Sequence, residues 1–272
     1  MDDLSVLEII NLVNIGISSF NCKQQVPSDL PMHGPFVDSS QLKSQEYLDR
    51  INLWTDAQEM IISEKKTKTM IVNFTDKFQF HTRLQLKGKS IEVVEKTKIL
   101  GTILTNTLSW DENCANIIKK VNARMQLIRK VWSFGSSITE MVQLWKVFCR
   151  SILEQSCVLW DSGLTQENRN SLERTQKTFL RLILEEDYRN YENALSVCHL
   201  ETLEKRRKTL TSRFAHTSLA DGHFSDLFPI RSKSHKMKTR TKGKYKIFHA
   251  NTERFRKSPI LTMQRLLNKE EN

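Results

Sequence analysis

Proline is absent between Phe36 and Phe228, although the chain has five prolines and three of them fall between Pro27 and Pro35. Proline interrupts helices because it has no amide hydrogen to donate and its ring clashes with the preceding turn. Apolar residues recur at helical spacing over much of the proline-free stretch. The sequence therefore predicts that this stretch is mostly helical.

Cysteine pairs, long apolar runs and a signal sequence are also missing. The five cysteines are scattered and form no CxxC pair, which argues against a disulfide framework and favours reduced intracellular thiols. No apolar run reaches the length that spans a bilayer, and no basic region precedes an apolar one at the N-terminus. We therefore expect an intracellular protein of the cytoplasm, the nucleus or both, without a membrane partner.

The spacings of common metal and nucleophile motifs are absent as well. The seven histidines pair with no cysteine at zinc-ligand spacing. There is no Ser/His/Asp arrangement and no Gly-rich phosphate loop. These absences argue against zinc-site proteins, serine hydrolases and P-loop proteins.

Positive charge is what the chain has in excess, and it is concentrated near the C-terminus. The formal net charge is +11, and residues 231–257 contain eleven Lys or Arg and one acid, which is +10 in this segment alone. Such a block attracts phosphate backbones through counterion release, and aromatic residues inside it can stack on bases. A solvated tail that binds nothing is the alternative. The candidate nucleic-acid contacts are Lys236, Lys238, Arg240, Lys242, Lys244 and Lys246, interleaved with Tyr245, Phe248 and Phe255.

The first hundred residues are expected to mix helices and strands. Apolar spacing predicts helices over 4–20 and 41–60, with a proline-containing loop between them. Thr69–Phe74 is a short β-type run. Arg83–Leu86 and Ile91–Val94 flank Lys87–Ser90 as a hairpin would, and Lys98–Leu104 forms a further strand in which Gly101 marks a bulge or a close backbone approach.

Helices are expected from Trp110 onward. Ser137 followed by Glu140 predicts a capping box at the start of one of them. The residues expected to face inward are Ile117, Val121, Met125, Ile128 and Trp132 in the first helix, Met141, Leu144, Trp145, Phe148 and Ile152 in the second, Leu172, Phe179 and Ile183 in a third over 166–184, and Leu203, Leu210 and Phe214 in a fourth over 202–219. Trp160 is also expected in this core.

An Asp-Asp pair, Asp2 and Asp3, stands directly after Met1. Adjacent carboxylates at a tight turn can hold Mg²⁺, which prefers carboxylate and water oxygens, and two-metal phosphoryl transfer needs several such ligands. By itself the pair is also typical of a solvated helix cap, and the order of later motifs is more specific. In chain order these motifs are Trp54-Thr55, Ile61–Met70, Ile99-Leu100-Gly101, Leu108-Ser109-Trp110, Leu153-Glu154-Gln155-Ser156 with Trp160, Leu172–Lys177, Tyr188 with Tyr191, and Leu203 with Arg206-Arg207.

From end to end, this series resembles the C-terminal half of the reverse transcriptases encoded by non-LTR (LINE-type) retrotransposons. In that family an Asp-Asp turn of the palm holds catalytic metal, and a helix ending in Trp and an Asn-x-x-Lys-Thr turn into a strand follow. A Leu-Gly strand of the primer-grip region then leads to a helical thumb with Leu-Glu-Tyr-like and Leu-Glu-x-x-Gln motifs. The resemblance implies an RNA-directed DNA polymerase, a nucleotidyltransferase that uses Mg²⁺, an RNA template and a DNA primer.

The resemblance also implies roles for particular residues. Asp2 and Asp3 match the metal-binding pair and are the expected catalytic Mg²⁺ ligands. Lys66 matches the lysine of the turn beside the catalytic site, where it is the expected catalytic residue that stabilises the leaving pyrophosphate or orients the nucleotide. A lysine at a helix C-terminus is the alternative. Leu100 and Gly101 match the strand that approaches the primer end and are expected to contact nucleic acid.

Two positions depart from the family pattern, with Ser63 where Asn is usual and Gln155 where an aromatic residue is usual. The family's fingers, a further metal-binding aspartate and any endonuclease domain precede the Asp-Asp turn. The expectation is therefore a fragment that does not polymerise by itself, and whether it is an enzyme is left open. A non-enzymatic nucleic-acid-binding remnant that uses the thumb and the basic tail is the alternative, and a decaying gene copy without a selected role is a third.

The expected fold class is α+β, in three parts. Residues 1–108 would form a partial palm, 109–222 a helical thumb-like domain, and 223–272 a basic tail of weak structure in which Pro259–Asn268 forms a short helix. Lys120 and Arg124 are the expected thumb contacts to duplex phosphates, and a plain solvated face is the alternative. Lys119, Arg129 and Lys130 lie off the same apolar stripe.

Overall fold

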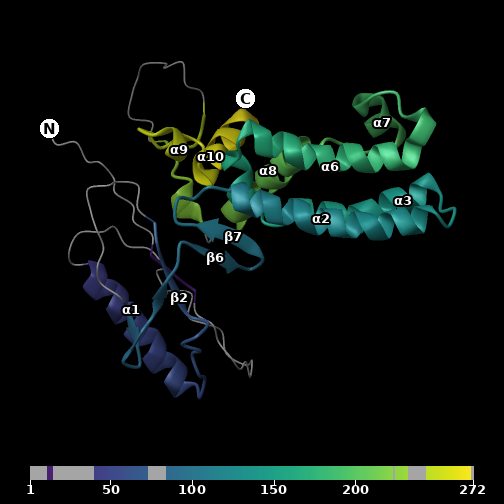
Figure 1. The fold of residues 1–272 in the computed structure, drawn as a ribbon. Coiled ribbons are helices and arrows are strands. Elements are labelled where there is room, and N and C mark those ends of the chain that lie inside the picture. Colours follow the sequence, from purple (N-terminus) through teal and green to yellow (C-terminus); the bar gives the residue numbers. More distant parts are fainter. Residues whose placement is uncertain (1–10, 15–39, 73–83, 223, 232–242, 271–272) are drawn as a thin grey trace, which may run out of the picture. The chain divides into compact units, whose positions relative to one another are not determined.

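The computed structural model describes residues 11–14, 40–72, 84–222, 224–231 and 243–270. The chain divides into two compact units, Met1–Ser109 and Trp110–Asn272, and the division lies beside the boundary expected at 108/109. Helices and small sheets both occur, which is compatible with the expected α+β class. Figure 1 shows the strands in the first unit and long helices in the second.

A small sheet in the first unit joins three short strands in the order β1-β2-β5. Strand β1 (Asn11–Asn14) runs antiparallel to β2 (Lys68–Ile71), and β5 (Glu92–Val93) runs parallel to β2. The strand expected from Thr69 is confirmed by β2. The helix expected over 4–20 is wrong at 11–14, because the backbone of β1 pairs with β2 and tertiary pairing overrides local periodicity. The rest of that expected helix lies outside the described residues.

Two tight hairpins follow β2, and both turn through residues with positive φ. Strands β3 (Gln85–Leu86) and β4 (Lys89–Ser90) are joined by Lys87 and Gly88, at φ of 51° and 79°. The type I′ turn of a two-residue hairpin needs positive φ at both central positions, which glycine adopts without a Cβ clash. The expected hairpin is therefore present, but its turn is tighter than Lys87–Ser90.

The second hairpin corrects the expected single strand over Lys98–Leu104. Strands β6 (Lys96–Ile99) and β7 (Thr102–Thr105) pair antiparallel, with Ile99 opposite Thr102. Leu100 and Gly101 form the turn, at φ of 46° and 90°. Gly101 therefore marks a chain reversal and not a bulge within one strand.

Helix α1 (Ser40–Ala57) confirms the helix expected over 41–60 and covers the first hairpin. Leu48 of α1 is buried in a cluster with Ile62, Leu84, Leu86 and Ile91. The Gln45 side chain forms two hydrogen bonds with the backbone of Gln85. Its Nε2 donates to the Gln85 carbonyl at 2.8 Å, and its Oε1 accepts from the Gln85 amide at 2.9 Å. Side-chain packing and these two hydrogen bonds together attach α1 to β3.

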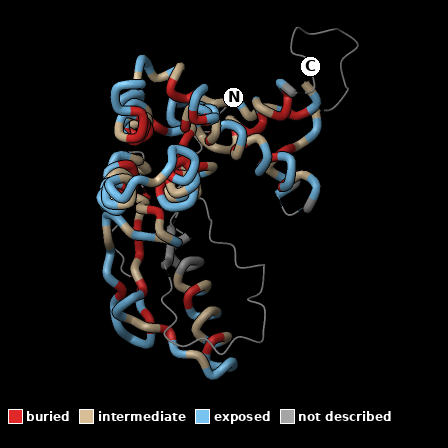
Figure 2. The backbone as a smooth tube through the Cα atoms, turned by 90° about the vertical axis from the view of Figure 1, so that its right-hand side faces the viewer, coloured by how far each residue is buried: buried red, intermediate tan, exposed pale blue. Residues whose placement is uncertain are grey.

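The second unit is built from helices around one large apolar core. Figure 2 shows how buried positions alternate with exposed ones along these helices. In chain order the elements are α2 (Asp111–Trp132), α3 (Ile138–Leu144), the π-helical turn η1 (Trp145–Arg150), α4 (Ser151–Glu154), α5 (Cys157–Trp160), η2 (Asp161–Gly163), α6 (Gln166–Leu184), η3 (Glu185–Asp187), α7 (Tyr191–Val197) and α8 (Leu203–Asp221).

The core confirms most of the expected inward positions. Trp145 and Trp160 are fully buried, and the Trp145 ring stacks on Phe179 with centroids 4.6 Å apart. The capping box of Ser137 and Glu140 starts α3 as expected. Phe148 is 39% exposed, contrary to expectation, because the wider π-helical turn shifts the register and brings Cys149 and Leu153 inward instead.

Helix α8 differs most from its expected face. Leu203 is buried and Leu210 packs partly against the core, but Phe214 is 42% exposed. The buried side of this helix carries polar and small residues, so apolar spacing could not identify it. These residues are Arg207, Thr211, Ala215 and Ser218.

The described part of the basic segment is folded onto α8, which differs from the weak structure expected there. It contains η4 (Ser225–Leu227), α9 (Glu253–Arg256) and α10 (Pro259–Glu270), and α10 confirms the short helix expected at 259–268. Asn268 of α10 brackets Tyr245, accepting from its amide and donating to its carbonyl, both at 2.9 Å. The apolar residues of this layer are Ala215, Phe228, Tyr245, Met263 and Leu267.

Candidate nucleic-acid interface

The expected metal site cannot be placed, because Asp2 and Asp3 lie outside the described residues. The same is true of four expected nucleic-acid contacts, Lys236, Lys238, Arg240 and Lys242. Within the described ranges, no group of three or more His, Cys, Asp or Glu side chains could hold a metal ion. Lys66, Leu100, Gly101, Lys120, Arg124, Lys244 and Lys246 are described, and they belong to both units.

Lys66 lies in a hydrogen-bonded turn that leads directly into β2. The Lys66 and Thr67 amides donate to the Ser63 carbonyl at 3.1 and 3.0 Å, and the Thr67 hydroxyl donates to the same carbonyl at 2.9 Å. Thr67 is fully buried whereas Lys66 is exposed. The alternative of a helix-terminal lysine is wrong, because the nearest preceding helix ends at Ala57. The turn fixes the backbone while leaving the lysine at the surface.

Leu100 and Gly101 are at the tip of the β6-β7 hairpin. The Leu100 side chain is 90% exposed, which is unusual for an apolar residue of this size. Lys96 and Lys98, both exposed, share one face of β6 because side chains alternate along a strand. The hairpin therefore presents an apolar tip beside two lysines.

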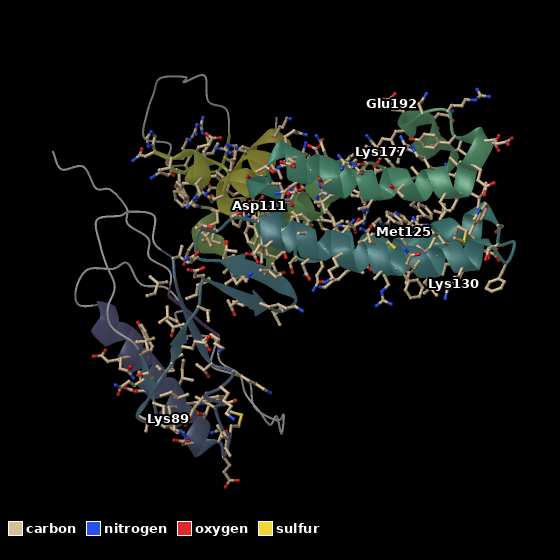
Figure 3. All side chains as sticks on the ribbon, viewed as in Figure 1. Lys89, Asp111, Met125, Lys130, Lys177 and Glu192 are labelled. Carbon is tan, nitrogen blue, oxygen red and sulfur yellow. The ribbon has the colours of Figure 1, made fainter. Side chains whose placement is uncertain are left out.

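The exposed part of helix α2 carries positive charge. From Asn113 to Trp132 it has five basic residues and no acid. Lys120 and Arg124, four residues apart, lie on neighbouring turns of one face. Arg124 is exposed and Lys120 is half-buried, whereas Met125 is buried in the core. Figure 3 labels Met125 on this helix and Lys130 near its C-terminal end. Lys119, Arg129 and Lys130 are also exposed.

Lys244 and Lys246 are exposed on either side of a buried Tyr245. An isolated bridge pairs Tyr245 with Ile230, and the Lys246 amide donates to the Pro229 carbonyl at 2.8 Å. The Lys244 Nζ lies 5.3 Å from the centroid of the Tyr245 ring. Tyr245 was expected to be available for base stacking, but its ring packs in the C-terminal core instead.

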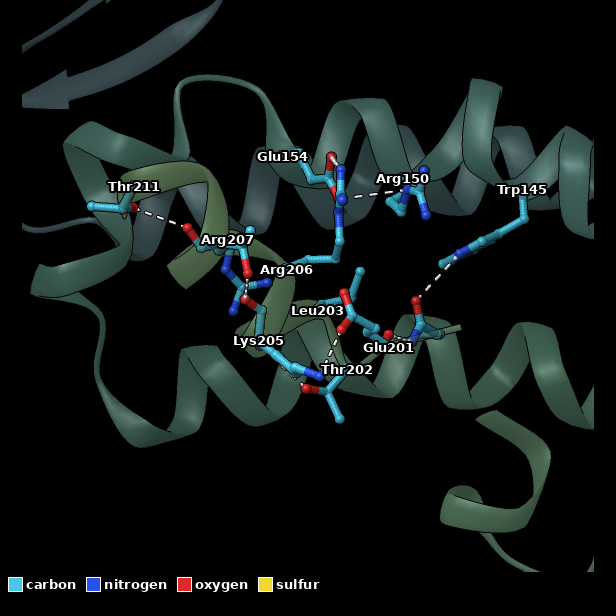
Figure 4. Close-up of polar contacts among 12 residues, drawn as sticks. Trp145, Arg150, Glu154, Glu201, Thr202, Leu203, Lys205, Arg206, Arg207 and Thr211 are labelled. Atoms are coloured by element: carbon cyan, nitrogen blue, oxygen red, sulfur yellow. Dashed lines mark hydrogen bonds and ion pairs between the residues drawn. The ribbon is translucent and has the colours of Figure 1, made fainter. Parts of the chain in front are cut away.

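Several motif residues that carry the resemblance contact one another in the helical unit. Arg206 donates to Glu154 through two nitrogens at 2.9 and 3.2 Å, and Arg150 approaches the same carboxylate at 3.5 Å (Figure 4). The hydrogen bond to Glu154 raises the pKa of Arg206, whereas burial lowers the pKa of Arg150. This arrangement ties α8 to α4.

A second set of these residues ties α6 to α7 and α8. The Tyr191 hydroxyl donates to Glu173, and the Leu203 amide donates to the same carboxylate at 3.1 Å. Burial, with this hydrogen bond, raises the pKa of Tyr191 well above its usual value. Gln176 accepts from the Trp145 indole at 3.3 Å and donates to the Glu201 carbonyl at 2.9 Å. The motif residues thus position the helices that carry the surface charge.

Arg207 was not identified from the sequence as a buried group. Its Nε donates to Asp161 Oδ1 at 2.6 Å, and its guanidinium lies 5.7 Å from the Trp160 ring centroid. The side chain has no exposed area, and its two Nη atoms have no hydrogen-bond partner in the described part of the chain. Arg169 also reaches Asp161, donating to its carbonyl at 2.6 Å.

A basic hollow of about 380 Å³ adjoins this buried pair, and sequence reasoning missed it. Its charged lining comes from stretches far apart in the sequence, so no local motif could have identified it. Tertiary packing of α6, η2, α8, α9 and α10 brings the residues together. The charged lining residues are Arg169, Lys208, Arg256, Lys257 and Arg265, with the acids Asp161 and Glu253.

Comparisons with protein-family models, with curated proteins and with solved structures find no match to this chain. In the described part of the chain, no helix combines the length and apolar composition that crossing a membrane requires.

Proposed function

We propose that this chain is part of an RNA-directed DNA polymerase of the non-LTR retrotransposon type, and that it binds the phosphate backbones of an RNA template and a DNA primer. One observation carries the proposal: helix α2 is anchored by a buried apolar stripe while its outer side bears five basic residues and no acid beyond Glu112. The ordered motifs of the resemblance supply the class of enzyme.

The spacing of charge on α2 suits a phosphate backbone. Lys119 and Lys130 are eleven positions apart, or roughly 16 Å at 1.5 Å per residue. Duplex DNA carries one charge per about 1.7 Å of its axis, so several phosphates fall within reach of this helix. Because the opposite face packs in the core, the basic face is held in a fixed orientation.

Two local structures in the first unit support the same proposal. The Ser63–Thr67 turn leads into β2, and the hairpin tip exposes Leu100 beside lysines. By resemblance, these positions lie beside the catalytic site and the primer end. An exposed leucine at a rigid turn can pack against a sugar or base.

In the intact enzyme, Asp2 and Asp3 would hold Mg²⁺ for two-metal nucleotidyl transfer from a dNTP to the primer. We also propose, as the resemblance implies, that the chain does not polymerise by itself. Template-dependent dNTP incorporation by the purified chain, abolished in Asp3→Ala, would contradict this.

The binding proposal is tested with a fluorescent RNA–DNA primer–template duplex and fluorescence anisotropy over a salt series. Lys120→Gln/Arg124→Gln should lower affinity on every sequence and reduce the slope of log K against log salt by about two, because each lost phosphate contact contributes about one. Arg174→Gln/Arg189→Gln, which removes the same charge from exposed positions elsewhere in the unit, is the control. Binding that is absent or independent of salt would refute the proposal.

A non-enzymatic nucleic-acid-binding remnant is the second candidate, and the exposed Lys244 and Lys246 favour it. They belong to the same compact unit as α2, so both could contact one nucleic acid. Neutralising Lys238, Arg240, Lys242 and Lys244 together should then weaken binding as strongly as the α2 variant. Unchanged affinity would remove the basic segment from the interface.

We also propose an intracellular location, in the cytoplasm, the nucleus or both. Cys114, Cys149, Cys157 and Cys198 are all free, buried thiols. Disulfides are typical of oxidising compartments, so free thiols suit a reducing one.

A further inference from the structure

We propose that the basic hollow beside Asp161 binds a phosphate group, and that in the function proposed above this phosphate belongs to a nucleic-acid strand. This inference rests on that function only for the source of the phosphate. The hollow lies within the second unit and is lined by five basic and two acidic side chains. Its volume, about 380 Å³, is in the range of pockets that hold small ligands.

The acids of the hollow do not neutralise its cations. Glu253 is shared by Arg256 and Lys257, and Asp161 is shared by Arg169 and the buried Arg207. Two carboxylates therefore form ion pairs with four cations, and a net positive charge remains in a partly enclosed space. Such a space concentrates anions, because the low-dielectric walls screen the field less than water does.

The remaining two cations point to the same conclusion. Among the described residues, Arg265 has no carboxylate partner, and its Nη1 donates to the Arg256 carbonyl at 2.8 Å. Lys208 pairs with Glu204 at 2.7 Å, in an exposed contact of a kind that contributes little energy. Both side chains are therefore available to an incoming anion at small cost.

Two hydrogen-bonding groups in or next to the hollow have unused donors. Ser162 is among the residues that line the hollow, and its hydroxyl is buried without a partner among the described residues. Behind Asp161, the two Nη atoms of Arg207 are buried and likewise without a described acceptor. A buried donor without an acceptor costs about 1–3 kcal/mol. The phosphodiester oxygens of a strand accept hydrogen bonds and donate none, so they match this set of donors.

A second hollow continues the first along α8. It is lined by Lys208, Arg213 and His216, and it shares Lys208 and Leu266 with the first. Lys208 and Arg213 therefore extend the positive charge along α8. This continuity favours consecutive phosphates of one strand over an isolated phosphate monoester.

Helix α8 offers a closely matched control for the test. Lys205 pairs with Glu201, which directly precedes the N-cap of α8, at 2.7 Å, and Lys208 pairs with Glu204 within the helix at the same distance. Both lysines are similarly exposed. Lys208 lines the hollow, whereas Lys205 is not among its lining residues. Lys208→Gln and Lys205→Gln thus remove the same charge and the same kind of ion pair, and they differ in position alone.

The experiment measures two probes on the full chain: inorganic phosphate by ³¹P NMR titration, and a fluorescent single-stranded oligonucleotide with or without a 5′-phosphate by anisotropy. Lys208→Gln and Arg265→Gln should each lower the affinity for both probes about tenfold, as expected for the loss of a charged hydrogen bond. Ser162→Ala should weaken them severalfold without lowering the melting temperature, because it removes a donor that has no partner. Lys205→Gln should stay within twofold of the unsubstituted chain.

The outcomes separate this proposal from the proposed function. Equal affinity in Lys208→Gln and Lys205→Gln overturns the hollow as a phosphate site, whether or not α2 binds nucleic acid. Loss of phosphate binding in Lys208→Gln supports the site even if no oligonucleotide binds, and in that case the proposed function fails. If the oligonucleotide binds only when it carries the 5′-phosphate, the bound phosphate is a terminal monoester and not part of the strand's backbone, which overturns the strand as its source.

Discussion

The two units of this protein reach a folded state in different ways. In the first, strands of two to four residues pair in small sheets, and the described apolar cluster is limited to Leu48, Ile62, Leu84, Leu86 and Ile91. In the second, long helices enclose a much larger core that contains Trp145, Trp160 and Phe179. Isolated hairpins are marginally stable, whereas packed helices bury wide apolar faces.

Polar interactions differ between the units in the same direction. In the first unit, ion pairs such as Lys87–Asp56, 2.9 Å apart, lie at the surface. In the second, Arg207–Asp161 is buried and Glu154 holds two arginines. Burial makes a polar contact expensive to break, so the helical unit should depend on individual polar residues more than the strand unit does.

The largest expected effect comes from breaking the buried pair. Asp161→Ala should lower the free energy of unfolding by about 3–5 kcal/mol, because Arg207 would keep a buried charge without its partner. Asp56→Ala removes an exposed partner of Lys87 and should cost at most about 1 kcal/mol. Urea denaturation followed by circular dichroism measures both, and equal costs would contradict the comparison.

Truncating apolar side chains should give the next largest effects. Phe179→Ala removes the ring stacked on Trp145 and should cost about 3–5 kcal/mol. Leu86→Ala in the small cluster should cost about 2–3 kcal/mol, because a smaller core collapses more easily around the lost volume. Thermal unfolding of the two variants tests this order. A larger loss of stability in Leu86→Ala than in Phe179→Ala would contradict it.

Alkaline pH should weaken the helical unit through its buried thiols. Burial raises the pKa of Cys114 and of Cys149 from 9.0 to about 12. The folded state therefore holds these protons after the unfolded state has released them, so stability is full below pH 9 and falls as pH rises towards 12, by about 1.4 kcal/mol per pH unit for each thiol.

The measurement is urea unfolding between pH 8 and pH 11, with Cys114→Ala/Cys149→Ala as the control. The control should show a flatter dependence on pH over this range. If the free energy of unfolding falls with pH as steeply in the control as in the unsubstituted chain, groups other than these thiols cause the loss of stability at alkaline pH.

The smallest effects are expected at chain turns. Ser137→Ala removes the cap of α3 and should cost about 1 kcal/mol. Gly88→Ala meets no neighbouring atom but must adopt a φ of +79°, so it should cost about 1 kcal/mol through backbone strain alone. Similar losses in both units would show that local geometry, unlike burial, does not distinguish them.

Expectations from the sequence succeeded where a pattern was long and local. The apolar stripe of α2, the bounds of α6 and the capping box before α3 match the structure. The expectations failed where contacts with other parts of the fold determine the local structure. Strand β1 pairs with β2, the π-helical turn moves Cys149 inward, and α8 buries Arg207 against Asp161. Local spacing contains no information on any of these partners.

For the candidate sites the same division holds. The sequence by itself determined the excess of positive charge, the basic side of α2 and the order of the motifs, since these depend on residue type and on one helical period. Only the tertiary structure decided that Glu154 meets Arg206, that Leu100 lies at a hairpin tip, and that Arg169, Lys208 and Arg265 line one hollow. Glu154 and Arg206 lie far apart along the chain, as do the three residues of the hollow, and only packing of the helices brings each set together.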